Sequence, residues 1–237
     1  MSSSKGQELQ VSPPVATLQN DAGADIEDPA LEQVCLQELD LDLEYPAAFS
    51  DREIPWSRKY SCRVHVKRYS KSSTVEIGRA QQEITALLAI QDVSVPRMLD
   101  YFDPARTIYV ILQDRDDLPL KQYIEKYGSF SEDLLKSVVT QLFNALAAIF
   151  LAGFAHLSIR DESLYIDADG QLTIKDFQHT HKYGTRKEDD IYATTDVRYG
   201  KDIWTAPEVL AAGKYNARKA VLWSCGIAIV CTRIAHR

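Results

Sequence analysis

The chain carries two short polar stretches that decide its fold, HLSIRDES at residues 156–163 and DFQ at residues 176–178. Between them lie two β-rich runs, 164–166 and 172–174, separated by the turn sequence Asp-Ala-Asp-Gly. Asp and Gly at these positions favour a tight connection between antiparallel strands. The sequence therefore predicts a short hairpin with a polar stretch on either side.

Upstream of this hairpin the pattern is mainly that of strands. Residues 62–67 alternate apolar and polar side chains, which predicts a strand. Ser72 and Ser73 then offer an N-cap, and residues 75–90 show apolar residues at helical spacing. Residues 98–102 and 108–112 predict two strands joined by a hairpin through Asp103–Arg106.

Downstream of Asp116 the pattern becomes helical. Ser131, followed by two acidic residues, predicts a helix start by capping and by the helix dipole. An apolar stripe from Leu134 to Ile149 lies on one face of this helix, and Gly153 ends it. A strand-rich first part and a helix-rich second part predict an α+β fold with two lobes.

The composition indicates which kinds of partner and which cellular compartment to expect. A net charge of −7 with dispersed basic residues argues against a nucleic-acid partner. The four cysteines form no CxxC pair and show no metal-ligand spacing with the five histidines. No signal pattern begins the chain, and the apolar run near its end is interrupted by Ser224 and Gly226. We expect an intracellular protein, in the cytoplasm or nucleus, without a membrane partner.

The first 53 residues differ from the rest. Residues 1–30 are rich in Ser, Gln, Asp, Ala and Pro, a composition that predicts a disordered tail. Residues 31–53 mix leucines with acidic residues and allow either a linker or degenerate first strands. The predicted folded domain covers residues 54–237.

Four motifs in order resemble those of the eukaryotic protein kinase family. HLSIRDES resembles the catalytic loop H-R-D-L-K-P-E-N, and DFQ resembles D-F-G. Further on come Ala-Pro-Glu at 206–208 and Trp-Ser-Cys-Gly at 223–226, which resembles the start of the family's long central helix. The resemblance implies a small β-rich lobe at 54–113 and a helical lobe at 114–237. Because the chain ends at Arg237, within or just after the central helix, we expect a truncated helical lobe.

The resemblance also implies a site for ATP and magnesium. Arg63 is assigned to the position of the ATP-binding lysine, with Glu83 as its carboxylate partner or as one half of a purely structural ion pair. Leu112 takes the gatekeeper position, and Gln113 opens the hinge. Asp176 is the expected magnesium ligand. The basic run Lys67, Arg68 and Lys71 is interpreted as a solvated strand end.

The catalytic loop departs from the family pattern at three positions. Ser158 stands where the family has the aspartate that accepts the substrate hydroxyl proton. Arg160 replaces the loop lysine, and Ser163 replaces the asparagine that binds the second magnesium ion. A serine hydroxyl has neither the basicity of the aspartate nor the affinity of a carboxylate for a hard cation.

Other departures lie around the loop. Gln178 replaces the glycine of D-F-G, and Val221 replaces the central-helix aspartate that anchors the catalytic loop. No glycine occurs between Gly23 and Gly78, so the glycine-rich loop that covers the phosphates is missing.

These departures favour a catalytically impaired kinase-like domain, a pseudokinase, that serves as a protein-binding or allosteric module. The alternative is a divergent serine/threonine kinase that transfers the ATP γ-phosphate, since Glu83 and Asp176 are present. A third hypothesis is a truncated fragment without independent function. The expected partner is another protein.

Overall fold

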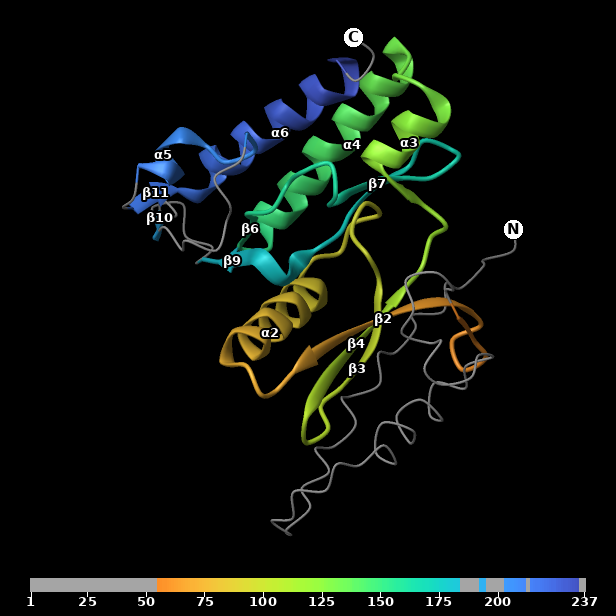
Figure 1. Cartoon of the computed structure of the whole chain (residues 1–237), viewed down its shortest axis with the longest axis vertical. Coiled ribbons are helices and arrows are strands. Elements are labelled where there is room, and N and C mark those ends of the chain that lie inside the picture. Colours follow the sequence, from red (N-terminus) through yellow and green to blue (C-terminus); the bar gives the residue numbers. More distant parts are fainter. Residues whose placement is uncertain (1–54, 184–191, 195–202, 212–213, 235–237) are drawn as a thin grey trace, which may run out of the picture.

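The computed structural model describes residues 55–183, 192–194, 203–211 and 214–234. They form two lobes, a small lobe built around a β-sheet and a larger lobe built around helices (Figure 1). The predicted α+β architecture is confirmed. The predicted tail at 1–30, the segment at 31–53 and Ile54 lie outside the described residues.

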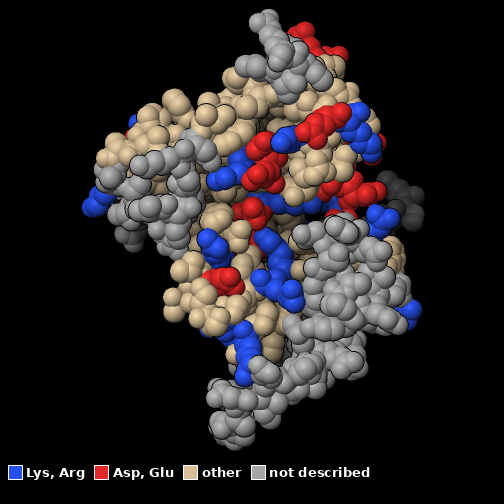
Figure 2. Space-filling view, in the orientation of Figure 1, with Lys and Arg blue, Asp and Glu red and all other residues tan. Residues whose placement is uncertain are grey.

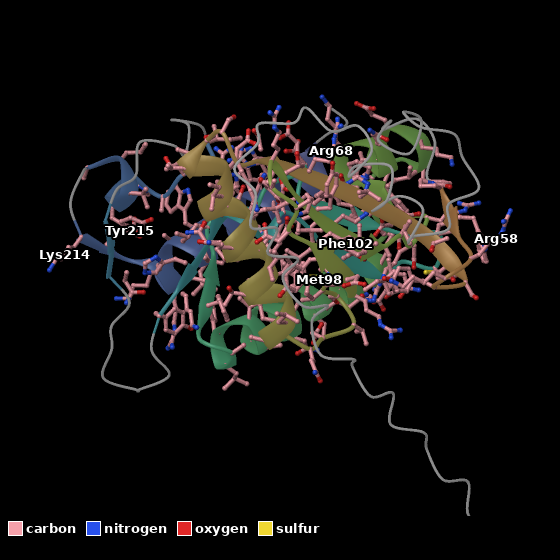
Figure 3. The ribbon with its side chains drawn as sticks, turned by 90° about the horizontal axis from the view of Figure 1, so that it is seen from below. Arg58, Arg68, Met98, Phe102, Lys214 and Tyr215 are labelled. Carbon is pink, nitrogen blue, oxygen red and sulfur yellow. The ribbon has the colours of Figure 1, made fainter. Side chains whose placement is uncertain are left out.

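The small lobe has a four-stranded antiparallel sheet in the order β1-β2-β4-β3. Its strands are β1 (Trp56–Ser57), β2 (Cys62–Ser70), β3 (Met98–Phe102) and β4 (Thr107–Gln113). The expected strand alternation is present in β2, where Val64 and Val66 are buried on one face with Ile111 of β4. Met98 and Phe102 lie along β3 in the middle of the view from below (Figure 3).

The single helix described in the small lobe is α2 (Thr74–Ala89). Ser73 caps it, because the serine Oγ accepts a hydrogen bond from the backbone N–H of Glu76 at 3.4 Å. One face of α2, including Glu83 and Leu87, is buried against the sheet and against the turn that follows β8. This packing brings the middle of the helix to the boundary between the lobes (Figure 1).

The helical lobe contains four α-helices among the described residues and several two- or three-residue strands. The helices are α3 (Leu120–Tyr127), α4 (Glu132–Leu151), α5 (Pro207–Leu210) and α6 (Ala217–Ile234). The strands are β5 (Leu118–Pro119), β6 (Phe154–His156), β7 (Leu164–Ile166), β8 (Leu172–Ile174), β9 (Thr180–Lys182), β10 (Tyr192–Thr194) and β11 (Lys214–Asn216), with a 3₁₀ turn η2 at Phe177–His179.

The hairpin predicted between the two polar stretches is formed by β7 and β8. Gly170 closes its turn with a φ of 79°, in the left-handed region that glycine enters without strain. The pairs β6–β9 and β10–β11 were not predicted. Each joins short segments whose apolar pattern is too brief to identify a strand.

Helix α4 is the central packing element of the helical lobe. Ser131 caps it as predicted, by accepting from the backbone N–H of Leu134 at 3.2 Å. By length and composition alone α4 could cross a membrane. In the fold, however, its apolar face is buried, and the Gln141 side chain donates to the Gly170 carbonyl and accepts from the Leu172 N–H. These contacts are typical of a core helix.

Candidate functional site

Three charged side chains from both lobes meet at the lobe boundary, and we call them the ion-pair centre. Lys67 of β2 places its Nζ atom 2.7 Å from Oε1 of Glu83 on α2 and 3.3 Å from Oδ1 of Asp176. The Glu83 side chain is only 1% exposed. Figure 2 shows acidic and basic side chains gathered between the sheet lobe and the helical lobe. The centre thus links a strand, a helix and the D-F-G-like turn.

A second donor fixes Glu83 from the same strand. The Tyr69 hydroxyl donates to Oε2 of Glu83, so each carboxylate oxygen has a partner from β2. Lys67 and Tyr69 are two residues apart, which places both side chains on the face of the strand that looks toward α2. Burial, together with the Glu83 carboxylate, raises the pKa of Tyr69, so the phenol remains a donor at neutral pH.

Lys67 and Asp176 are held in their charged forms. Burial disfavours the ammonium form of Lys67, but the carboxylates of Glu83 and Asp176 outweigh it and raise the pKa of Lys67 overall. Burial acts against the ionised form of Asp176 as well, yet the neighbouring Lys67 ammonium lowers the pKa of Asp176. The attraction between the Lys67 ammonium and the Asp176 carboxylate is therefore present throughout the neutral pH range.

The predicted partnership between Arg63 and Glu83 is wrong. Arg63 lies at the start of β2, where its Nη1 atom is 3.5 Å from Oδ1 of Asp116, and both side chains are largely exposed. Lys67, interpreted from sequence as a solvated strand end, is the residue that reaches Glu83. Residues 63, 65, 67 and 69 all lie on one face of the strand, so alternation could not choose among them. Four residues of strand separate Arg63 from Lys67 by about 13 Å, and only the position of α2 decides which of the two meets Glu83.

The residues at the predicted gatekeeper and hinge positions lie where β4 ends. Leu112 is buried, 6% exposed, in the core shared with α2. The Gln113 backbone N–H donates to the Arg97 carbonyl at 2.9 Å, and the next N–H, of Asp114, donates to the Arg63 carbonyl. These bonds fix the segment that leaves the small lobe. Contact of either residue with a nucleotide stays a prediction.

The catalytic-loop segment runs from β6 to β7 and is closed by its own hydrogen bonds. The Ser163 hydroxyl accepts from the Arg160 backbone N–H at 2.9 Å and donates to the Arg160 carbonyl at 3.1 Å. Ser163 is 1% exposed. Its oxygen is therefore part of the internal bonding of the loop.

Ser158 is also buried, at 5% exposed, and its backbone N–H donates to Nδ1 of His156 at 3.4 Å. Its side chain lines a cavity between the catalytic loop and α5–α6. The lining residues are Leu157, Ser158, Ile159, Arg160, Trp204, Thr205, Ala206, Val209, Tyr215, Ala220, Val221 and Ser224. None of them carries a carboxylate, and Val221 presents only methyl groups to the loop.

His156 acts as a packing and hydrogen-bonding residue. Its Nε2 donates to the Lys175 carbonyl at 2.9 Å, since Nδ1 is the acceptor for Ser158. Its ring meets Phe177 edge to face, with centroids 4.8 Å apart. Complete burial lowers the pKa of His156 to about 4, so the ring is neutral at physiological pH. Phe177 lies in one hydrophobic core with Leu87, and Met98 packs against that core.

The geometry around Asp176 does not fit two catalytic magnesium ions. Oδ1 of Asp176 accepts from Lys67 and from the Gln178 side-chain amide, each at 3.3 Å. Ser163, the other expected ligand, uses its hydroxyl within the loop. In the described part of the chain no group of three His, Cys, Asp or Glu side chains is arranged to bind a metal. Of the two expected magnesium ligands, Asp176 is thus the one that offers a carboxylate, and the Ser163 hydroxyl is used within the loop.

Comparison with known proteins agrees with this geometry. Residues 56–236 match the protein kinase domain family. CBL-interacting protein kinase 11 of Oryza sativa subsp. japonica is 28% identical over 167 residues, which cover 69% of this chain and 33% of that protein. CBL-interacting serine/threonine-protein kinase 15 of Arabidopsis thaliana is 26% identical, over 69% of this chain and 39% of that protein.

The serine/threonine-protein kinase BCK1/SLK1/SSP31 of Saccharomyces cerevisiae is 28% identical over 173 residues, which cover 70% of this chain and 11% of that protein. The chain thus spans between 11% and 39% of the length of these three relatives. The family match extends over most of the chain and includes both the ion-pair centre and the catalytic-loop segment. The chain belongs to the protein kinase domain family, whose members generally use ATP and magnesium.

Proposed function

We propose that this kinase domain does not transfer phosphate and acts as a protein-binding or allosteric module. The observation that carries the proposal is the environment of Ser158. By its resemblance to the family's catalytic loop, Ser158 stands at the place of the general base, and the described residues that line its cavity carry no carboxylate to take over the proton. Without an acceptor, the attacking hydroxyl group of a substrate keeps its proton as the bond to phosphorus forms.

The size of the missing contributions supports the proposal. General-base assistance accounts for about 10²–10⁴-fold in rate. Most of the remaining acceleration of phosphoryl transfer comes from positioning and from the electrostatics of metal ions and phosphate-binding groups. Ser163 supplies no free ligand for the second metal ion, and the sequence lacks the glycine-rich loop. The losses affect separate contributions, so no single remaining group offsets them.

Apolar surface on the helical lobe supports a binding role. Large apolar side chains near α5 and along α6 are exposed, among them Ile203, Leu210, Leu222 and Trp223. The Trp223 indole N–H donates to the Ile203 carbonyl at 3.4 Å, which brings two of these side chains together. Neighbouring exposed apolar residues of this size are typical of protein–protein contact surfaces. The expected partner is an intracellular protein.

A divergent serine/threonine kinase is the second candidate, and the ion-pair centre favours it. The Nζ atom of Lys67 lies 2.7 Å from Oε1 of Glu83 and 3.3 Å from Oδ1 of Asp176, and an active kinase site requires a lysine and an aspartate in such an arrangement. Under this hypothesis the γ-phosphate of ATP is still transferred, at a rate reduced by the loss of the base.

A transfer assay with radiolabelled ATP and generic acceptor proteins separates the two. We expect incorporation equal to that of an Asp176→Asn variant, which removes the charge on the remaining metal ligand while keeping its size. Incorporation by the unmodified chain that disappears in this variant would establish the divergent kinase. A Lys121→Met variant, altered at an exposed position on α3, serves as the control for non-specific effects.

A further inference from the structure

Lys175, the residue before Asp176, directs its side chain toward the segment that connects the two lobes. Its Nζ atom lies 2.5 Å from Oδ1 of Asp117 and 3.9 Å from the centroid of the Tyr165 ring. Asp117 belongs to the segment that joins β4 of the small lobe to β5 of the helical lobe, and Tyr165 lies on β7. The lysine thus connects the end of β8 with the interlobe connection.

This contact is built into the structure. The Asp117 side chain is 1% exposed, and Lys175 is the cation that balances its charge among the described residues. Oδ2 of Asp117 is also buried and makes no hydrogen bond with the described part of the chain. One oxygen of this buried carboxylate already has no hydrogen-bond partner, so breaking its ion pair would strongly destabilise the fold. Asp117 therefore holds Lys175 in place.

The ammonium group also covers an aromatic face. A cation 3.9 Å from a ring centroid is in direct contact with the ring, and cation–π attraction adds to the ion pair. A flat base could stack on Tyr165 only after the ammonium has moved. The cavity that borders Ser158 is lined by other residues and does not include Tyr165, Asp117 or Lys175.

We propose that Lys175 is a specificity-determining residue that occludes the nucleoside part of the cleft. Its ammonium group covers the face of the Tyr165 ring and is paired with the carboxylate of Asp117, so that an adenine base cannot stack on Tyr165. The neighbouring ion-pair centre remains assembled. The inference rests on the proposed function, because both concern the same cleft and occlusion explains how the domain avoids ATP.

Binding of adenosine and of ATP, each measured by isothermal titration calorimetry with the full chain, tests the occlusion. Lys175→Met removes the ammonium group and keeps the length of the side chain. We expect affinity for adenosine to rise about tenfold or more, because the competent state no longer requires displacement of the lysine. Loss of a positive charge should by itself weaken ATP binding, so a gain with both ligands cannot come from simple electrostatics.

Because Lys175→Met leaves Asp117 buried without a counter-charge, the double variant Lys175→Met/Asp117→Asn is measured in parallel. It removes both charges and should show the same gain with less loss of stability. Asp117→Asn alone weakens the hold on Lys175 and should give a smaller gain. Lys121→Met, on the exposed face of α3, should bind as the unmodified chain does.

The outcomes separate this inference from the proposed function. Unchanged adenosine affinity in the folded single and double variants overturns the occlusion, whether or not phosphate is transferred. Phosphotransfer by the unmodified chain overturns the proposed function, whatever the adenosine affinities are. A gain in affinity without phosphotransfer supports both.

Discussion

The ion-pair centre and the catalytic-loop segment lie next to each other in the cleft but differ in what their polar groups do. In the ion-pair centre, Lys67 joins two carboxylates from different elements and so ties the small lobe to the helical lobe. In the catalytic loop, the Ser163 hydroxyl bonds only to Arg160 of the same loop, and Ser158 lines a cavity whose described lining residues carry no carboxylate. The ion-pair centre thus joins charged groups from three elements, whereas the two serines are uncharged and the Ser163 hydroxyl is bonded within its own loop.

This difference indicates that the residues retained in the site are those that stabilise the fold, whereas the residues replaced are those needed for catalysis. Glu83 is buried and would be costly to leave unpaired, so Lys67 and Tyr69 stabilise the fold whether or not a nucleotide binds. A catalytic-loop aspartate and a second metal ligand contribute mainly to chemistry, and uncharged serines can replace them without leaving a buried charge unpaired. A complete ion-pair centre is therefore weak evidence for activity in this chain.

The largest expected effect comes from breaking the ion-pair centre. Glu83→Ala leaves the Tyr69 hydroxyl without its buried acceptor and leaves Lys67 with Asp176 as its carboxylate partner, so we expect a loss of about 3 kcal/mol, at the lower end for a broken buried pair. Chemical denaturation should show this as a lower free energy of unfolding. The matched control is Glu132→Ala, which breaks an exposed pair with Lys136 and should cost less than about 1 kcal/mol.

If the two glutamate variants lose similar amounts of stability, the ion-pair centre has no special structural role. Retention of Lys67, Glu83 and Asp176 would then support the divergent kinase instead.

The next effect is a pH dependence that arises at the boundary between the two regions. The pKa of His156 falls from its ordinary 6.5 to about 4 in the folded chain. Between these values the unfolded chain binds the proton and the folded chain does not, so stability falls as the pH is lowered from 6.5 to 4. Integrated over the shift, the loss from this group is about 3 kcal/mol.

Measurement of the free energy of unfolding from pH 7.5 to pH 4 checks this expectation. His156→Gln should flatten most of the slope, because it removes the buried imidazole. A slope that persists in His156→Gln would assign the pH dependence to other groups, of which His179 and His181 also have pKa values lowered by burial.

The smallest effect distinguishes the two serines within the catalytic loop. Ser163→Ala removes a buried hydroxyl that bonds to the N–H and the carbonyl of Arg160, which costs about 1–3 kcal/mol. Ser158 makes no side-chain hydrogen bond with the described residues, so Ser158→Ala should cost less than about 1 kcal/mol. Thermal unfolding of the two variants side by side measures the difference. Equal losses would show that the Ser163 bonds do not close the loop.

The sequence by itself determined the main elements and the order of the motifs. Period-two alternation identified β2, serine caps marked the starts of α2 and α4, and the Asp-Ala-Asp-Gly turn identified the β7–β8 hairpin. These signals are local, since each depends on neighbours within a few residues. For the same reason the replacements Ser158, Ser163 and Val221 could be read directly from the motifs.

Only the tertiary structure decided which side chains meet. Arg63 and Lys67 share one face of β2, and the choice between them depends on where α2 packs, a contact between residues 16 positions apart. The partner of Lys175 is Asp117, 58 positions away, and no local pattern indicates the pair. Ion pairs depend on distances of a few ångströms between elements that are remote in the chain, and the packing of the two lobes sets those distances.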